Sequence, residues 1–196
     1  MRVVVIGGTG TIGRAVVEAL RDRHEVIAAS RSGEPQVDLA DRRTIDQLFE
    51  RLNDIDAVVC CAANAPLGSM TESSQEAFVA SITPKLLGQV GVAIRATAHL
   101  RDGGSITLTS GAIPEGTTGA AGGALVNAGL EAFVRATARD LERGLRINAV
   151  SPGWVAETMA ELGMDPDQGT PAAEVARSYV AAVEGTMQGE ILRPGR

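Results

Sequence analysis

One segment near the start of the chain has the residue types and spacing to hold a phosphate group. It reads Gly7-Gly8-Thr9-Gly10-Thr11-Ile12-Gly13 and satisfies both G-x-G-x-x-G and G-x-x-G-x-x-G spacing. Glycines let the backbone turn tightly and approach a pyrophosphate, whose charge is met by free amides and by the positive end of a following helix. The segment therefore predicts dinucleotide binding; the alternative is a glycine turn without a ligand.

The charge at the end of the next predicted strand indicates which dinucleotide fits. A carboxylate about 20 residues beyond the glycines binds the ribose 2′-hydroxyl of NAD, whereas a cation there accommodates the 2′-phosphate of NADP. The sequence has Ser30, Arg31 and Ser32 at this point and no acid. A guanidinium between two hydroxyls suits a phosphate, so NADP(H) is preferred over NAD(H). The alternative is that Arg31 is one of many solvated arginines.

These residues need a scaffold, and the hydrophobic pattern predicts alternating strands and helices. Unbroken apolar runs are typical of strands buried on both faces, and apolar residues three and four apart indicate helices. Strands are predicted at 3–7, 25–29, 56–63, 105–110, 145–151 and 190–192. Helices are predicted at 11–21, 42–52, 76–100 with a break near Pro84, 120–143 and 172–183. The alternation implies an α/β Rossmann fold, a doubly wound parallel sheet of about seven strands with helices on both faces.

Composition sets the class of protein. A chain of 196 residues with 44% hydrophobic and 21% charged content is one globular domain, which we expect to span residues 1–196. A net charge of −6 and an aromatic content of 3% disfavour nucleic-acid binding. No apolar run approaches the roughly 18 residues of a membrane helix, so no membrane partner is expected.

The cysteines and histidines indicate a reducing compartment and no metal site. Cys60 and Cys61 are adjacent, so on a strand their side chains point to opposite faces and do not easily form a disulfide. A cytoplasmic location follows. His24 and His99 lie far apart in sequence, and no cluster of metal ligands accompanies either.

Over nearly its whole length the chain resembles the short-chain dehydrogenase/reductase family. The matching features are the glycine segment, Asp38-Leu39, Asp56, Ser110 and the specific block RINAVSPGWV at 146–155. The resemblance implies that Asp38 and Leu39 contact adenine. It further implies that Pro152, Gly153 and Val155 lie beside the nicotinamide, with the Val155 backbone holding its carboxamide.

The same resemblance implies a proton relay that this chain lacks. In the family a Tyr exchanges the carbonyl proton, a Lys four residues later lowers the pKa of that Tyr, and a Ser about 13 residues earlier polarises the substrate oxygen. Counting from Ser110 places Gly123 at the Tyr position and Asn127 at the Lys position. Tyr179 is the only tyrosine and Lys85 the only lysine, so the chain contains no Tyr-x-x-x-Lys pair.

Several residues remain as candidates at this place. Asn127 shares a helix side with Leu130, so it is predicted to face the sheet and could hydrogen-bond ribose hydroxyls. Lys85 takes the helix position that often carries a catalytic Asn in the family. It either replaces the missing cation or is a surface lysine beside a proline kink. Ser110, the retained member of the relay, either orients a carbonyl or is a relic.

The family's Asn-Asn-Ala-Gly motif is also altered, and Ala62 is the cofactor-binding candidate within it. The motif reads Cys60-Cys61-Ala62-Ala63 in this chain. The segment after Pro152 is shorter than the substrate-covering segment usual in the family. A small carbonyl or alcohol substrate is the expectation.

The helix predicted at 120–143 is apolar on two sides. One side carries Leu130 and Val134, and the opposite side carries an alanine ridge, defined as Ala120, Ala124, Ala128, Ala132 and Ala136. Such a ridge predicts a second helix packed closely against it, in this subunit or in a partner's. The alternative is an alanine-rich face in solvent. With the family resemblance, the ridge favours a homodimer or homotetramer.

Two functions of different classes fit these residues. The first is an NADP(H)-dependent short-chain oxidoreductase acting on a small carbonyl or alcohol by a non-standard proton route, with Ser110 and Lys85 as catalytic candidates. The alternative is a catalytically inactive NADP(H)-binding redox sensor or regulatory module, which explains the missing Tyr and Lys directly. A scaffold with an empty glycine loop is the weakest reading, because the loop and the Pro-Gly block are both intact.

Overall fold

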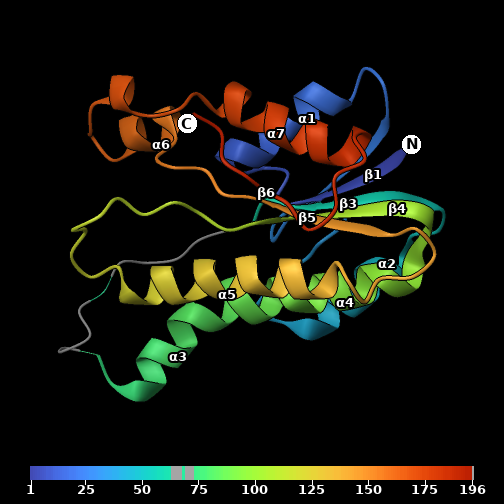
Figure 1. Cartoon of the computed structure of the whole chain (residues 1–196), viewed down its shortest axis with the longest axis horizontal. Coiled ribbons are helices and arrows are strands. Elements are labelled where there is room, and N and C mark those ends of the chain that lie inside the picture. Colours follow the sequence, from blue (N-terminus) through green and yellow to red (C-terminus); the bar gives the residue numbers. More distant parts are fainter. Residues whose placement is uncertain (63–67, 69–72, 196) are drawn as a thin grey trace.

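A single parallel sheet lies between two layers of helices in the computed structural model, which describes residues 1–62, 68 and 73–195 (Figure 1). Its six strands follow the order β2-β1-β3-β4-β5-β6. Their bounds are β1 (Arg2–Ile6), β2 (Glu25–Ala29), β3 (Ile55–Cys60), β4 (Leu100–Thr109), β5 (Arg146–Val150) and β6 (Ile191–Leu192). The doubly wound α/β fold predicted from the sequence is confirmed, with six strands in the described residues where about seven were expected.

The helices cover both faces of the sheet. On one face lie α1 (Thr11–Leu20) and α7 (Ala172–Glu184), with the short α6 (Ala156–Glu161) beyond them (Figure 1). On the other face lie α2 (Arg42–Arg51), α4 (Gln89–His99) and α5 (Ala121–Thr137), and α3 (Gln75–Thr83) extends away from the sheet. A 3-10 turn at Pro166–Gln168 follows α6. Sequence patterns missed α6, which has too few residues to show a periodicity.

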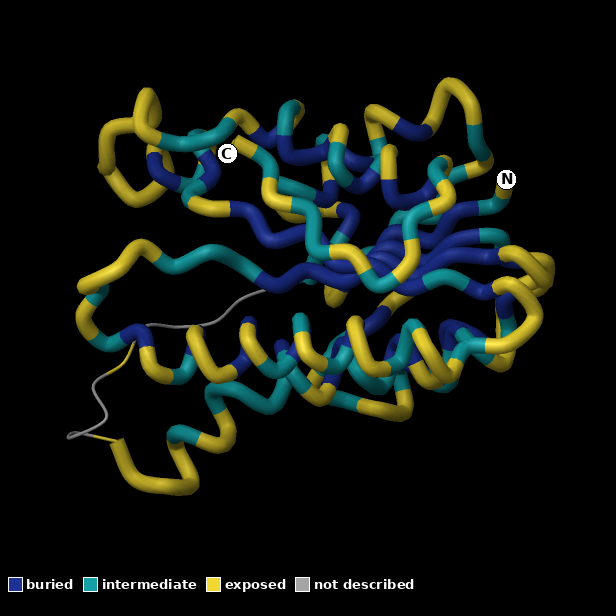
Figure 2. The backbone as a smooth tube through the Cα atoms, viewed as in Figure 1, coloured by how far each residue is buried: buried dark blue, intermediate teal, exposed yellow. Residues whose placement is uncertain are grey.

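The core consists of two clusters, one on each side of the sheet, because successive side chains of a strand point to opposite faces. Val4 and Ile6 of β1 belong to the cluster beneath α2, α4 and α5, whereas Val3 and Val5 belong to the cluster beneath α1 and α7. Figure 2 shows the strands as the most buried part of the backbone. The two cysteines obey the same alternation, since Cys60 joins the first cluster and Cys61 packs against the second. Their predicted opposite orientation is confirmed, and both thiols are free.

A helical stretch runs from Gln75 to His99 through a wide π turn at Pro84–Gly88. A proline has no N–H to donate to the preceding turn, and its ring crowds the carbonyl there, so a regular α-helix cannot continue through it. Among the residues the structure describes, this stretch is the one candidate for a membrane span by length and composition, with a mean hydropathy of 1.5. The sequence expectation of no such stretch was therefore wrong. Within it, α4 packs Val92, Ala93 and Ala96 into the core, and 28% of the apolar window is buried inside the structure.

Two predicted boundaries also differ from the structure. Helix α5 ends at Thr137 rather than near Arg143, and turns follow it in which the Arg139 and Asp140 N–H groups donate to carbonyl oxygens three residues back. Arg143 and Gly144, with φ values of 55° and 67°, then reverse the chain ahead of β5. Strand β4 starts at Leu100 rather than at Ser105, since Leu100 pairs with Ile55 before an irregularity in the ladder. Ala63, placed in the third predicted strand and in the altered motif, lies outside the described residues.

Candidate functional site

The glycine segment forms the turn between β1 and α1. Gly7 has a φ of 81°, and a Cβ on it would lie 2.6 Å from the Ala62 backbone nitrogen. A Cβ on Gly13 would overlap the Gly7 carbonyl oxygen, and one on Gly8 would lie 2.8 Å from the Ala28 Cβ. At these three positions the chain itself leaves room only for glycine. At Gly10 the nearest atom to such a Cβ is the Gly7 oxygen at 3.4 Å, an ordinary contact, so the space above Gly10 has room for a methyl group among the described residues.

The first turn of α1 presents uncapped amide groups beside this space. Gly10 is the residue before the helix, and no side chain caps it. The first turn also carries no acidic residue. Unpaired N–H groups and the helix dipole together make such a terminus positive, so it attracts an anion. Thr11 and Ile12, predicted from the motif, lie in this turn.

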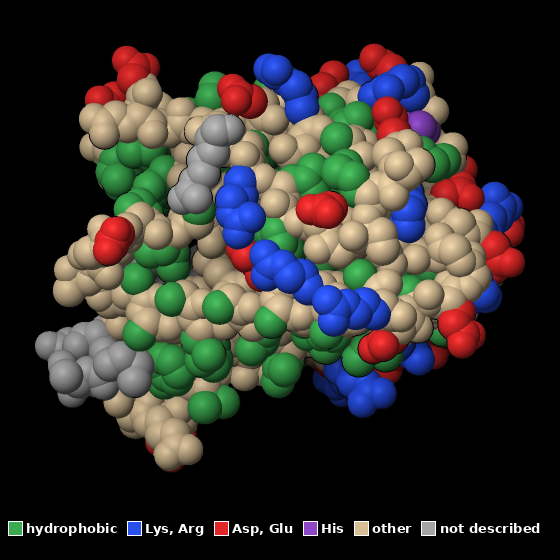
Figure 3. Space-filling view, viewed as in Figure 1, with side chains coloured by type: hydrophobic (Ala, Val, Ile, Leu, Met, Phe, Trp, Pro, Cys, Tyr) green, Lys and Arg blue, Asp and Glu red, His purple; other side chains and the backbone are tan. Residues whose placement is uncertain are grey.

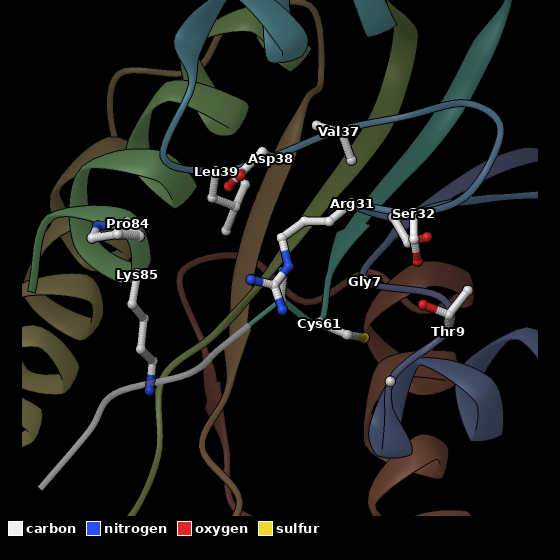
Figure 4. A pocket seen from close by; sticks show the side chains of 13 residues that line it. Gly7, Thr9, Arg31, Ser32, Val37, Asp38, Leu39, Cys61, Pro84 and Lys85 are labelled. Carbon is white, nitrogen blue, oxygen red and sulfur yellow. The ribbon is translucent and has the colours of Figure 1, made fainter. Parts of the chain in front are cut away.

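A pocket of about 390 Å³ opens at the carboxyl ends of β1, β2 and β3 (Figure 4). This edge is a switch point of the sheet, because β1 lies between β2 and β3, and ligands of doubly wound folds bind at such points. Most of the residues predicted from the sequence line it: Gly7, Thr9, Gly10, Ser30, Arg31, Ser32, Asp38, Leu39, Ala62 and Lys85. The structure thus brings together residues from the first half of the chain that lie far apart in sequence.

The end of β2 supplies the polar wall of the pocket. Arg31 is exposed, and its guanidinium extends across the pocket (Figure 4). Ser30 is 5% exposed, and its hydroxyl has no hydrogen-bond partner among the described residues. Asp38 lies on the same wall, but its carboxylate accepts a hydrogen bond from the Ala40 backbone at 2.9 Å. A buried hydroxyl without a partner is costly, so Ser30 favours a polar ligand here.

Lys85 enters the pocket from the π turn, on the side away from Gly7 and Thr9 (Figure 4). The residue is only 5% exposed, which excludes the surface lysine considered from the sequence. Its Nζ donates to the Ser110 carbonyl oxygen at 3.0 Å and to Asn127 Oδ1 at 2.8 Å. Burial lowers the pKa of this ammonium from 10.5 to about 8, since removal from water disfavours the charged form. The site therefore holds a cation that titrates near neutral pH.

Asn127 is buried on the sheet-facing side of α5, as its helix position predicted. It does not line the pocket among the described residues, but its amide oxygen faces the Lys85 ammonium. Gly123, one turn earlier, is buried on the same side. The Lys and the Asn thus form a hydrogen-bonded pair between α5 and the π turn.

Ser110 follows β4, with 2% of its surface exposed. Its hydroxyl donates to Glu131 Oε1 at 3.2 Å, and its carbonyl oxygen accepts from Lys85. The hydroxyl is therefore not directed at the Lys85 ammonium. Sequence analysis missed Glu131; the available signal was its position on the same helix, four residues after Asn127.

Gln89 is a second residue that sequence analysis missed. It is fully buried on α4, and its amide makes two hydrogen bonds with the Thr109 backbone, at 2.9 Å to the carbonyl oxygen and 2.8 Å from the N–H. The same amide nitrogen donates to the Lys85 carbonyl oxygen at 3.2 Å. Gln89 thereby fixes the π turn that carries Lys85 to the end of the strand that precedes Ser110.

The only tyrosine lies on the opposite face of the sheet. Tyr179 on α7 is fully buried in the cluster beneath α1 and α7, and its hydroxyl lies 2.7 Å from Thr109 Oγ1. Burial raises the pKa of this phenol well above its usual value. The Cys61 thiol, which lines the pocket, also has a pKa well above its usual value because of burial. Neither group is a proton donor or nucleophile matched to neutral pH.

The Pro-Gly block lies at the same edge of the sheet but outside the pocket. The Pro152 carbonyl oxygen accepts from the Ala112 N–H at 2.7 Å, and Val155 pairs with Thr170 just before α6. Ser110 is next to this block, since its N–H donates to the Val150 carbonyl oxygen at 2.9 Å. Of the predicted cofactor residues, the described pocket lining therefore omits Gly8, Thr11, Ile12, Gly13, Asn127, Pro152, Gly153 and Val155.

Comparisons with known proteins agree with this geometry. A family model described as enoyl-(acyl carrier protein) reductase matches residues 8–184. The chain belongs to the short-chain dehydrogenase/reductase family. The matched range contains the glycine segment from Gly8 onward, Lys85, Ser110 and Asn127. The comparison with curated proteins gave no match.

Solved structures share the fold of this short-chain dehydrogenase/reductase over its whole length. The protein lin1944 from Listeria innocua is 33% identical, with a TM-score of 0.92 and coverage of 98% of both chains. A small-chain dehydrogenase solved in complex with NADPH is 28% identical, with a TM-score of 0.87 and coverage of 98% of this chain and 95% of that one. A short chain dehydrogenase from Burkholderia cenocepacia, solved in complex with NADP, is 23% identical, with a TM-score of 0.82 and the same coverages, and shows the fold alone.

Proposed function

We propose that this short-chain dehydrogenase/reductase binds NADP(H) across the pocket at the ends of β1, β2 and β3. The glycine segment and the uncapped start of α1 would hold the pyrophosphate. Arg31, with the unpartnered Ser30 hydroxyl and Ser32, would hold the 2′-phosphate. The NADPH complex of the small-chain dehydrogenase that is 28% identical supports the same preference. Bound there, NADPH supplies a hydride.

The reaction we propose is reduction of a small carbonyl compound, or the reverse oxidation, with Lys85 as the proton donor in place of the absent Tyr. As a carbonyl carbon takes up hydride, negative charge develops on its oxygen, and a positioned cation or acid stabilises that charge. The observation that carries this proposal is the buried Lys85 ammonium, held by Ser110 and Asn127 and lining the same pocket as the glycine segment. Two of its three N–H groups are directed at these partners, which leaves one for a substrate oxygen.

Ser110 keeps a place in this proposal as a residue beside the substrate. Its backbone oxygen accepts from the ammonium, and its hydroxyl donates to Glu131. We expect Ser110→Ala to reduce turnover less than Lys85→Met, because only Lys85 can both donate a proton and carry charge.

Cofactor choice is tested by titrating NADPH and NADH and following the nicotinamide fluorescence. Arg31→Ala should weaken NADPH binding by tenfold or more while leaving NADH binding nearly unchanged, because only NADPH carries the 2′-phosphate. The matched control is Arg177→Ala, which removes an exposed arginine on α7. A wild-type preference for NADH would remove Arg31 from this role.

Catalysis is tested by NADPH oxidation with a panel of small aldehydes and ketones, together with an enoyl thioester. Lys85→Met should abolish turnover and spare NADPH binding. The exchange of the pair, Lys85→Asn with Asn127→Lys, returns a cation to the same place from the other helix and should recover part of the activity. Turnover that survives Lys85→Met would overturn the assignment of Lys85 as the proton donor. If the protein turns over only the enoyl thioester, then an enoyl thioester, and not a small aldehyde or ketone, is the substrate class.

A second candidate function is a redox sensor or regulatory module that binds NADP(H) without turnover. It is favoured by one observation, the placement of the only phenol on the far face of the sheet from Lys85. Such a protein would bind NADPH tightly, oxidise it with no member of the panel and form partner complexes that differ between NADP and NADPH.

We also propose that a second copy of the chain covers the alanine ridge. Ala124, Ala128, Ala132 and Ala136 are exposed, so no helix among the described residues packs over them. Figure 3 shows hydrophobic side chains gathered along this side of the molecule. The exposed Leu125 adjoins the ridge. The exposed ridge supports a homodimer or homotetramer. We further propose that residues 1–196 form one NADP(H)-binding domain and that the protein is cytoplasmic.

A further inference from the structure

Glu131 connects three parts of the molecule outside the pocket. It lies on α5 one turn after Asn127, and its side chain is 15% exposed. One carboxylate oxygen accepts from the Ser110 hydroxyl at 3.2 Å. The other accepts from Arg193, after β6, at 2.8 Å and from Arg135 at 3.5 Å. A carboxylate with two guanidinium partners thus accepts from the hydroxyl of the residue whose carbonyl oxygen holds the Lys85 ammonium.

The chemistry of this contact fixes the direction of the Ser110 hydroxyl. An ionised carboxylate only accepts hydrogen bonds, so Ser110 must donate to Glu131. A hydroxyl has a single hydrogen, which is then no longer free to polarise a substrate carbonyl. Its lone pairs stay free to accept. Lys85 has the opposite character, since an ammonium donates and never accepts.

We propose that Glu131 is a positioning residue that makes Ser110 a hydrogen-bond acceptor for the substrate hydroxyl, while Lys85 is the donor to the carbonyl oxygen. The inference rests on the proposed function. In reduction, the carbonyl carbon gains a hydride from NADPH, the C=O π bond breaks, and its oxygen takes a proton from Lys85 Nζ, which becomes a neutral amine. The new hydroxyl then donates to Ser110 Oγ. Arg193 holds Glu131 in place for this task.

The test compares KM for the best carbonyl of the panel with KM for its alcohol. Glu131→Ala should raise KM for the alcohol about fivefold, the value of one net hydrogen bond, without raising KM for the carbonyl. Glu131→Gln, whose amide oxygen can still accept from Ser110, should give a smaller change. The control Glu142→Ala removes an exposed carboxylate beyond the end of α5 and should change neither the KM for the alcohol nor the KM for the carbonyl. A general loss of structure would raise both constants together, and that result would overturn the proposal.

A double-mutant cycle shows whether Glu131 acts through Ser110. In a Ser110→Ala background, Glu131→Ala should have no further effect on either KM, and an undiminished effect there would overturn the proposal. If Glu131→Ala fails to fold, the test uses Arg193→Ala instead. This variant should also raise the KM for the alcohol, by less than fivefold. An unchanged KM for the alcohol would overturn the proposal.

The inference is separable from the proposed function. If the wild-type protein turns over no substrate, the proposed function fails, and the same cycle is measured on urea unfolding. Additive effects of the Ser110 and Glu131 variants would then overturn the positioning role as well. A clear coupling would support Glu131 as the group that orients Ser110, because the two side chains are hydrogen-bonded and substitutions at independent sites are additive.

Discussion

Lys85 is a buried cation whose described hydrogen-bond partners are all neutral. Its Nζ bonds a carbonyl oxygen and an amide oxygen, and burial holds its pKa at about 8. Between pH 8 and the ordinary lysine value of 10.5, the unfolded chain binds more protons than the folded one. Stability from this group therefore rises with pH across that window, and the cost of burying the charge is present in full below pH 8.

The first prediction follows from this cost. Lys85→Met should raise the free energy of unfolding at pH 7 by about 2 kcal/mol, the desolvation cost less the lost hydrogen bonds. It should also flatten the rise in stability between pH 8 and 10.5. Urea unfolding of both proteins at pH 7 and pH 10 measures the effect, and a destabilised variant at pH 7 would contradict it.

The second prediction concerns the pH dependence of carbonyl reduction. Because the proposed donor must be protonated, kcat/KM should fall about tenfold per pH unit above pH 8, where Lys85 loses its proton. Lys85→Arg places a guanidinium that keeps its charge, so any remaining activity should not fall in this range. The profile is measured at saturating NADPH; a wild-type profile that stays level to pH 10 would exclude Lys85 as the donor.

Some residues of this site could be identified from their types in the sequence, and the others only from the geometry of the fold. Arg31 and Lys85 could be singled out because one follows a strand end and the other is the only lysine. Glu131 and Gln89 could not, because acids and amides on helices are common. Their partners, Ser110 and Thr109, meet them only when helices from separate parts of the chain pack against β4.

At the scale of elements, the π turn is held to the sheet by one amide. The third prediction is that Gln89→Leu lowers the free energy of unfolding by about 2–4 kcal/mol, because the Thr109 N–H and carbonyl oxygen both lose their partner in the core. Turnover should fall as well, since the same amide holds the Lys85 carbonyl. Gln89→Glu puts a buried carboxylate against the Thr109 carbonyl oxygen, which has no hydrogen to donate, so it should cost at least as much stability as Gln89→Leu at pH 7. Urea unfolding ranks the three proteins.

The glycine turn yields the fourth prediction, from two positions of the same loop. Gly13→Ala should cost more than about 3 kcal/mol of stability, because the new methyl group meets backbone that cannot move aside. Gly10→Ala should leave the melting temperature nearly unchanged and weaken NADPH binding, since its methyl group projects into open space above the loop. The comparison pairs thermal unfolding with fluorescence titration. Equal destabilisation by both would mean that the loop is shaped by packing alone.

Most elements followed from periodicity, and the exceptions have physical causes. The strand at Glu25–Ala29 was predicted at its observed bounds, because an apolar run between polar turns leaves little choice. The π turn was seen only as a break near Pro84, since proline marks an interruption without stating which helix type absorbs it. The early start of β4 was hidden because Arg101 and Asp102 are polar and exposed, although their backbone continues the strand.

At the scale of the whole molecule, the alanine ridge leads to the fifth prediction. Ala128→Glu should shift the protein to a monomer, because a buried unpaired carboxylate at a close helix contact is strongly unfavourable. Ala173→Glu, at an exposed position on α7, is the control and should keep the native assembly. Light scattering coupled to size exclusion gives the masses. A wild-type protein that is already monomeric would contradict the prediction.

The alternation of strands and helices was sufficient for the architecture of the whole molecule but not for what covers it. The layered fold followed from the order of apolar runs along the chain. The ridge left three alternatives, which are a helix of the same subunit, a helix of a partner and an alanine-rich face in solvent. In the structure, the alanines of α5 are exposed while Leu130 and Val134 are buried. This packing excludes a covering helix of the same subunit among the described residues.

The strand order has a consequence for how this chain emerges from the ribosome. After β1 has been flanked by β2 and β3, each later strand joins the sheet beside the one made just before it, and none must be inserted between two strands already paired. Synthesis can therefore extend the sheet in one direction without undoing earlier hydrogen bonds. The residues that we propose to bind phosphate, from Gly7 to Ser32, are translated before Lys85 and Ser110. The emerging chain therefore holds the proposed nucleotide site before it holds the residues proposed for the reaction.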